Sequence, residues 1–182
     1  MATLYHRDIL VFGASAGGIE ALVEILANLP PDLPATLFVV QHLSPAYQSR
    51  LPELLSRGTP FRALYPVHGQ EIAPGHIYVA PPDNQLLLRQ GYVQVNRGPK
   101  ENGHRPSVDA LFRSAARAYG PRVIGVVLSG FLDCGTAGLM SIKARGGLAV
   151  VQDPDEAFAA EMPRSAINHV RVDHICKLKE MG

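Results

Sequence analysis

The sequence is poor in charge and contains no tryptophan. Only 18% of its 182 residues are Asp, Glu, Lys or Arg, and the formal net charge is +1. Globular domains average about 25% charged residues. A near-neutral chain has no basic surface that would attract the phosphates of nucleic acid or an anionic membrane. We therefore expect no nucleic-acid partner.

Cysteine is also scarce. The chain has two cysteines, Cys134 and Cys176, which lie far apart in the sequence. Neither belongs to a Cys-x-x-Cys motif or to a Cys and His spacing that is typical of zinc sites. The sequence thus predicts no disulfide framework, no metal site and no cofactor, and it predicts that both residues are reduced cysteines in the core.

Long hydrophobic segments are missing. A membrane-spanning helix needs about 20 consecutive apolar residues, and no stretch approaches that length. The start of the chain, MATLYHRDILVFG, lacks the apolar run and cleavage site of a signal peptide. The sequence predicts a cytoplasmic protein that is not embedded in a membrane. No repeat or linker divides it, so we expect a single domain over 1–182.

Hydrophobic periodicity predicts alternating strands and helices. Unbroken apolar runs typical of buried strands cover 8–12, 36–41, 76–80, 122–128, 148–152 and 172–178. Apolar residues at helical spacing predict helices at 19–26, 48–57, 106–119, 136–145 and 162–169. This alternation indicates a three-layer α/β domain with a mostly parallel, doubly wound sheet. The segments 85–89 and 92–95 predict an antiparallel hairpin near one edge.

Polar residues follow four of the predicted strands. They lie at 13–18, 41–44, 129–135 and 152–154. Ligands of open parallel sheets bind beyond the carboxyl ends of the strands, where loops run into helix N-termini. We therefore expect these four segments to build one site.

The first of these segments, GASAGG at 13–18, has three interpretations. Its G-x-S-x-G pattern between a strand and a helix is typical of a nucleophile elbow, which exposes the Ser15 hydroxyl and directs the next N–H toward an oxyanion. A phosphate or dinucleotide loop is the alternative, although Ser15 stands where G-x-G-x-x-G requires a glycine. The third interpretation is a tight turn without chemistry.

An elbow serine needs a base and a group that orients the base. His42 follows a buried strand, and an imidazole with a pKa of about 6.5 can accept and return a proton at neutral pH; otherwise it is a structural histidine. Asp133 is a candidate to orient the imidazole, or else an N-cap of the helix near Thr136. Five further histidines are expected to be structural: His68, His76, His104, His169 and His174.

Six blocks of the sequence, taken in order, resemble the catalytic domain of the CheB-type protein-glutamate methylesterases of bacterial chemotaxis. They are VFGASAGGIEAL, VVQHLSP, IYVAPPDNQLLL, RPSVDALFRSAA, VVLSGFLDCGTAGL and AVVQDP with MPRSAI. The resemblance spans nearly the whole chain. It implies a serine hydrolase that removes methyl groups from glutamyl methyl esters on chemoreceptor helices and releases methanol. In many members the same enzyme also deamidates receptor glutamines.

The resemblance assigns roles to particular residues. Ser15 in GASAGG matches the nucleophile, and His42 in QHLSP matches the general base. The resemblance extends to candidates for oxyanion stabilisation and for the substrate cleft: Ala16, Gly130, Phe131, Arg105, Asp109 and Met162.

The position of the triad acid departs from the family pattern. The family has its acid directly before the glycine of this turn, where this chain has Cys134, and Asp133 comes one residue earlier. A thiol is a weak hydrogen-bond acceptor and is mostly neutral at pH 7. Two interpretations stay open: a working esterase in which Asp133 replaces the acid, or an impaired or silent relative that binds receptors or a signalling partner. Gln85 and Glu161 are further departures near the same cleft.

Many relatives carry a receiver domain ahead of the esterase, and no receiver domain is recognisable in this chain. A stand-alone member and a fragment of a longer protein both fit that observation. The resemblance implies methylated chemoreceptor helices as partners, together with a separate receiver or other chemotaxis proteins.

Overall fold

The computed structural model describes residues 6–43 and 49–182. Within them, seven strands form a parallel sheet in the order β3-β4-β2-β1-β7-β8-β9. The strands are β1 (Ile9–Ala14), β2 (Thr36–Gln41), β3 (Arg62–Leu64), β4 (His76–Val79), β7 (Val123–Val127), β8 (Leu148–Gln152) and β9 (His174–Cys176). The chain enters at the centre of the sheet and extends it first to one side and then to the other. The predicted doubly wound α/β fold is confirmed.

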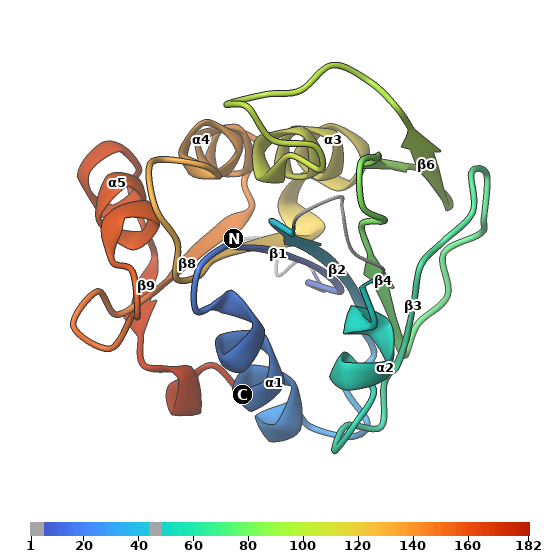
Figure 1. Ribbon diagram of the computed structural model, residues 1–182, viewed down its shortest axis with the longest axis horizontal. Coiled ribbons are helices and arrows are strands. Elements are labelled where there is room, and N and C mark those ends of the chain that lie inside the picture. The colour runs from blue at the N-terminus through green and yellow to red at the C-terminus, as the bar shows by residue number, and fades with distance from the viewer. Residues whose placement is uncertain (1–5, 44–48) are drawn as a thin grey trace, which may run out of the picture.

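Helices cover both faces of the sheet. They are α1 (Gly18–Asn28), α2 (Leu51–Leu55), α3 (Val108–Tyr119), α4 (Thr136–Ala144) and α5 (Glu161–His169), with the short 3₁₀ turns η1 (Gly120–Arg122) and η2 (Leu178–Glu180). Figure 1 shows α3, α4 and α5 on one face, and α1, α2 and the C-terminal turn on the other. In the described part of the chain, no helix has both the length and the hydrophobicity that a bilayer span requires.

Alternate residues of β1 belong to different halves of the core. Ile9 and Val11 pack in the cluster beneath α3, α4 and α5, whereas Leu10 and Phe12 pack in the cluster beneath α1. Side chains of a strand alternate between the faces of a sheet, so a strand that is buried on both faces must be apolar at every position. The unbroken apolar runs in the sequence therefore reflect burial on both sides.

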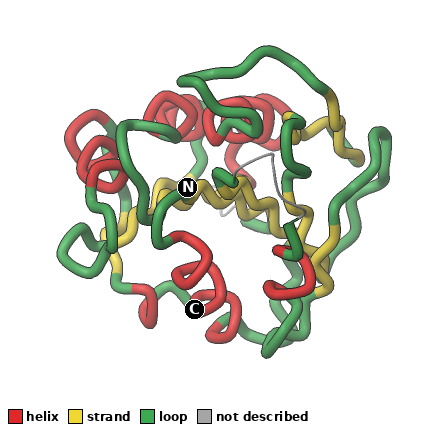
Figure 2. The backbone as a smooth tube through the Cα atoms, viewed as in Figure 1, coloured by secondary structure: helices red, strands yellow, loops and turns green. Residues whose placement is uncertain are grey.

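The predicted hairpin is confirmed as a separate two-stranded antiparallel sheet, β5 (Gln85–Arg89) and β6 (Tyr92–Asn96). It packs on α3: the Leu88 N–H donates to Ser114 Oγ at 2.9 Å, and the Tyr119 hydroxyl donates to the Arg89 carbonyl at 3.0 Å. Figure 2 shows the two strands apart from the central sheet and beside a helix. A helix, rather than another strand, thus covers this hairpin.

The differences from the predicted elements lie at the edges of the sheet. The helix expected over 48–57 begins at residue 51 and ends at 55, and residue 48 lies outside the described residues. Strand 62–64 was not predicted, and the strand expected over 172–178 is limited to 174–176. Both are edge strands whose residues are exposed or half-buried. Such strands need no apolar run, so hydrophobic patterning finds them poorly.

Candidate active site

The four polar segments converge at the carboxyl ends of the central strands. β1 lies between β2 and β7, which brings Ser15 between His42 and Ser129. The Ser15 N–H donates to the Ser129 carbonyl at 2.9 Å, and the His42 N–H donates to the Ala14 carbonyl at 3.1 Å. Gln152 joins them from β8, because its Oε1 accepts from the Ser129 N–H at 2.9 Å. Ser44 lies outside the described residues.

The turn after β1 has the geometry of an elbow. Gly17 has φ +74°, and a Cβ at that position would lie 2.5 Å from Cβ of Phe158. Glycine suits this position because it adopts a positive φ readily and has no Cβ to clash with Phe158, whereas other residues rarely adopt this backbone conformation. The Gly18 N–H donates to the Ser15 carbonyl at 2.9 Å, and α1 begins at once. Half-buried Ser15 therefore lies just before the positive end of a helix.

Two side chains of the predicted polar segments, to which the sequence analysis assigned no individual role, hold this turn. Nε2 of Gln41 donates to the Ser15 carbonyl at 2.7 Å. The Ser129 hydroxyl donates to the Ala16 carbonyl at 2.6 Å and accepts from the Ala159 N–H at 2.9 Å. Gln41 and Ser129 are both buried. Their place in the predicted polar segments 41–44 and 129–135, at the ends of buried strands, is the signal that could have assigned them this role.

The expected oxyanion groups differ in availability. Among the described residues, no hydrogen bond occupies the N–H groups of Ala16 and Phe131. The Gly130 N–H, by contrast, donates to the Ala159 carbonyl at 2.9 Å and cannot serve an oxyanion in this conformation. A Cβ on Gly130 would lie 2.1 Å from Sδ of buried Met162 and 2.8 Å from Cβ of Ser15. Gly130 and Met162 thus form the wall against which the elbow packs.

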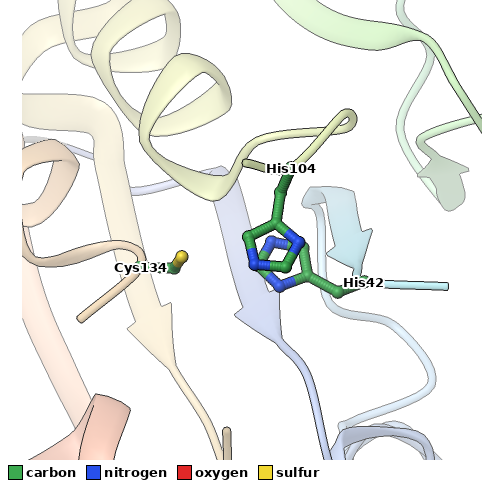
Figure 3. Close-up of side chains that lie close together, drawn as sticks. All are labelled: His42, His104 and Cys134. Carbon is green, nitrogen blue, oxygen red and sulfur yellow. The ribbon is translucent and has the colours of Figure 1, made fainter. Parts of the chain in front are cut away.

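His42 is stacked on His104. The ring centroids are 3.8 Å apart and the ring planes differ by 7° (Figure 3). Burial, and then the charge of His104, lowers the pKa of His42 to about 4. His42 is therefore neutral at pH 7, as a general base must be. His104 was expected to be structural and instead lies in the candidate site, directly before the RPSVD block from which two cleft residues were predicted.

The stack predicts an unusual titration of His42. We expect the His42 ring protons, followed by NMR, to titrate with a midpoint near pH 4, and we expect the His104→Ala variant to move this midpoint upward toward 6.5. The shift arises because the variant opens the buried site to water and removes a like charge. His169→Ala, a change in the last turn of α5, is the control and leaves the midpoint where it was. A wild-type midpoint near 6.5 would contradict the burial that the structure gives His42.

Cys134 faces the histidine pair. Its Sγ lies within 4.8 Å of a ring nitrogen of both His42 and His104, and the side chain is 3% exposed. Nδ2 of Asn102 is the hydrogen-bond donor to this sulfur, at 3.9 Å. Burial raises the pKa of the Cys134 thiol. A neutral thiol therefore occupies the position at which the resemblance implies the triad acid.

Asp133 points elsewhere. It is exposed, and in the described part of the chain no hydrogen bond joins its carboxylate to His42. Its backbone carbonyl accepts from the Thr136 N–H at 3.2 Å, but its side chain does not cap α4. In this structure Asp133 neither orients the imidazole nor serves as the N-cap. Ser15 and His42 lie at adjacent strand ends, and Nε2 of His42 has no hydrogen-bond partner among the described residues.

Asp109 supplies the cap of α4 that was one of the two interpretations of Asp133. Its buried carboxylate accepts from the Gly135 N–H at 3.1 Å and from the Gly138 N–H at 2.7 Å. These are free N–H groups at the start of α4, which a carboxylate stabilises. Asp109 thereby fixes the turn that carries Cys134, and in this conformation it is a positioning residue.

Loss of this cap has a measurable cost. We expect Asp109→Ala to lower the free energy of unfolding by about 1 to 3 kcal/mol, since two buried N–H groups lose their acceptor. Asp133→Ala, which removes an exposed carboxylate from the neighbouring turn, is the matched control and changes stability by less than about 0.5 kcal/mol. Urea unfolding measures both. Equal losses of unfolding free energy in the two variants would contradict the assignment of Asp109 as the cap of α4.

Arg105 and Gln85 fasten the loop that carries His104. Nε of Arg105 donates to the Asp83 carboxylate at 2.8 Å. Gln85 is buried; its Nε2 donates to the Pro99 carbonyl at 2.7 Å, and its Oε1 accepts from the Ser107 N–H at 2.8 Å. Glutamine at position 85 thus takes a structural role in this structure, and Arg105 is held by an ion pair.

Glu161 also has an internal partner. Its carboxylate accepts from the Leu132 N–H at 2.8 Å and so ties the loop after β7 to the start of α5. Large apolar side chains are exposed around this junction: Phe131 is 55% exposed, Leu132 60% and Phe158 79%. The mouth of the candidate site is therefore apolar on this side.

Comparison with known proteins identifies the family. The sequence model of the CheB methylesterase family matches residues 10–182. The protein-glutamate methylesterase/protein-glutamine glutaminase of Paraburkholderia xenovorans is 40% identical over 183 residues, which cover 98% of this chain and 50% of that protein. Protein-glutamate methylesterase/protein-glutamine glutaminase 3 of Burkholderia lata is 41% identical over 180 residues, covering 97% of this chain and 49% of that protein. The chain spans about half the length of these curated relatives.

The structural comparison agrees with the sequence comparison. The crystal structure of the Thermotoga maritima CheB methylesterase catalytic domain matches with a TM-score of 0.92 and 30% sequence identity. The match covers 98% of this chain and 96% of that chain. On the family match over residues 10–182 and this shared fold, the chain belongs to the CheB methylesterase family.

Proposed function

We propose that this chain is a serine hydrolase that removes methyl groups from glutamyl methyl esters of chemoreceptors and deamidates receptor glutamines by the same attack. The observation that carries the proposal is the convergence of an elbow serine, Ser15, and a neutral, half-buried His42 at adjacent strand ends of a CheB-type fold.

The chemistry follows from that pair. The Ser15 hydroxyl attacks the ester carbonyl while His42 takes up the hydroxyl proton. The carbonyl oxygen becomes an oxyanion, which the N–H groups of Ala16 and Phe131 are free to stabilise. The C–O bond to methanol then breaks as the imidazolium returns its proton to the leaving oxygen. Water, activated by His42, hydrolyses the acyl-serine to a glutamate carboxylate.

The apolar rim is suited to an amphipathic helix. Exposed Phe131, Leu132 and Phe158 lie on the loops around the elbow, and an apolar helix face can pack on such a surface. We place the reaction on the cytoplasmic helices of methylated receptors. A separate receiver or another chemotaxis protein is the further partner proposed.

One observation favours a second candidate, a receptor-binding member with little activity. Cys134 is a neutral thiol, and no carboxylate of the described residues is hydrogen-bonded to the His42 ring to orient it. Our proposal is a slow esterase rather than a silent one, because Ser15 in its elbow and His42 are both present at adjacent strand ends, and serine hydrolases that lack a triad member retain residual catalysis.

The test combines turnover with covalent trapping. Methanol release from methylated receptor membranes measures the reaction, and a fluorophosphonate traps an activated serine because the phosphorus forms a bond to Oγ as fluoride leaves. We expect methanol release and a label that mass spectrometry locates at Ser15. Methanol release without any label on Ser15 would refute the assigned nucleophile, and no release together with no label would refute the esterase.

A further inference from the structure

Three side chains from distant parts of the sequence form a compact donor cluster. They are His42 at the end of β2, His104 in the loop before α3 and Cys134 in the turn before α4 (Figure 3). One ligand atom from each, a ring nitrogen or the sulfur, lies within 4.8 Å of the other two. Sequence spacing predicted no metal site, because these residues form no local motif. The fold brings together three side chains that lie far apart in the sequence.

The donors of this cluster have few competing partners. Nε2 of His42 is buried and has no hydrogen-bond partner among the described residues. Within 6–43 and 49–182, the Cys134 sulfur has only the long side-chain contact from Nδ2 of Asn102, at 3.9 Å. Buried polar atoms are nearly always satisfied, and an orphaned one points to an ion or another missing partner. The cluster thus offers buried donor atoms with few competing partners, as a metal-binding site does.

Two imidazoles and one thiolate are a donor set that suits zinc. Zn²⁺ binds His nitrogen at about 2.0–2.1 Å and Cys sulfur at about 2.3 Å, commonly with three protein ligands and a water. Tetrahedral geometry at those lengths puts the ligand atoms roughly 3.3 to 3.6 Å apart, so the atoms of this cluster need to move by about 1 Å. The lone pair of an imidazole lies in the ring plane. The two parallel rings must therefore tilt toward each other as the ion binds.

We propose that His42, His104 and Cys134 bind one Zn²⁺ ion, with water as the fourth ligand. On binding, the S–H bond of Cys134 breaks, its proton passes to the solvent, and a Zn–S bond forms. The sulfur of Cys134 makes this donor set soft, and sulfur ligands favour zinc-class ions over magnesium or calcium. The bound ion occupies a nitrogen of His42, so it inhibits the esterase. The inhibition by the bound ion rests on the proposed function.

Cobalt is the spectroscopic probe of the site, and it requires no catalysis. We expect one equivalent of Co²⁺ to give the intense near-ultraviolet thiolate-to-cobalt band of a sulfur ligand, and one equivalent of Zn²⁺ to abolish that band. In Cys134→Ala the band disappears, and the Zn²⁺ affinity measured by calorimetry falls on the order of 100-fold or more. Cys176→Ala is the matched control, since Cys176 lies on β9 outside the cluster, and it keeps both signals.

A histidine variant completes the test. His104→Ala is expected to weaken Zn²⁺ binding at least about tenfold, whereas His169→Ala does not. Absence of the band in the wild-type chain, or its persistence in Cys134→Ala, would overturn the proposal. Zn²⁺ that binds at the site but leaves methanol release unchanged would instead refute the role proposed for His42 as the base. The two failures are therefore distinguishable.

Discussion

Replacement of Cys134 by aspartate is expected to raise the turnover of ester hydrolysis by about 10²- to 10⁴-fold. The Cys134 sulfur lies within 4.8 Å of a His42 ring nitrogen, and an aspartate oxygen reaches one bond further from the backbone than that sulfur does. A carboxylate there would hold the His42 tautomer and stabilise the imidazolium that forms in the reaction. Nδ2 of Asn102, which lies 3.9 Å from the sulfur, can donate to the second oxygen.

Cys134→Asn is the matched control for this gain. It has the shape of aspartate without the charge, and we expect its methanol release to stay within about tenfold of the wild-type rate. A Cys134→Asp variant that folds normally but gains nothing would refute the view that a missing acid limits the proposed ester hydrolysis. If Cys134→Asn gained as much turnover as Cys134→Asp, the shape of the side chain rather than its charge would explain the gain. That result would also refute the view that a missing acid is limiting.

Replacement of Ser15 by alanine is expected to reduce methanol release by at least about 10²-fold. In the proposed mechanism Ser15 supplies the hydroxyl that attacks the ester carbonyl, and alanine removes that hydroxyl. The variant should fold normally, because Ser15 contributes its backbone N–H and carbonyl to the turn, and alanine keeps both. Binding to receptor membranes should therefore survive while hydrolysis is lost.

Ser141→Ala is the control for this loss. Ser141 lies on α4, and among the described residues its hydroxyl donates only to the Ala137 carbonyl of the same helix, at 3.1 Å. We expect unchanged turnover in this variant. Hydrolysis that persists in Ser15→Ala would refute the nucleophile, whereas equal receptor binding in wild type and Ser15→Ala, with no hydrolysis by either, would support the receptor-binding alternative.

Local patterns in the sequence predicted the centre of this molecule well. The apolar run of β1 followed by GASAGG contains both the strand and the turn, because a buried strand and a tight glycine turn are each encoded by neighbouring residues. His42 was found in the same way, from its place at the end of a buried strand. The parallel sheet followed from the alternation of such strands with helices.

Features that depend on distant residues were not predictable in this way. His104 contacts His42 only because the loop before α3 folds over the end of β2, and nothing in the residues around His104 encodes that contact. The cap of α4 comes from Asp109 on α3, whereas the nearest acidic residue in the sequence, Asp133, faces the solvent. Side chains that act across elements are assigned by packing rather than by spacing.

The Ser129 hydroxyl gives the elbow a particular order of assembly. It donates to the Ala16 carbonyl, 113 positions earlier in the chain, and it accepts from the Ala159 N–H. The turn that holds the nucleophile is therefore completed only when β7 has paired with β1 and the segment before α5 has arrived. A nascent chain emerges from the ribosome N-terminal end first. Although Ser15 is among the first residues made, its turn stays unfinished until most of the chain has been synthesised.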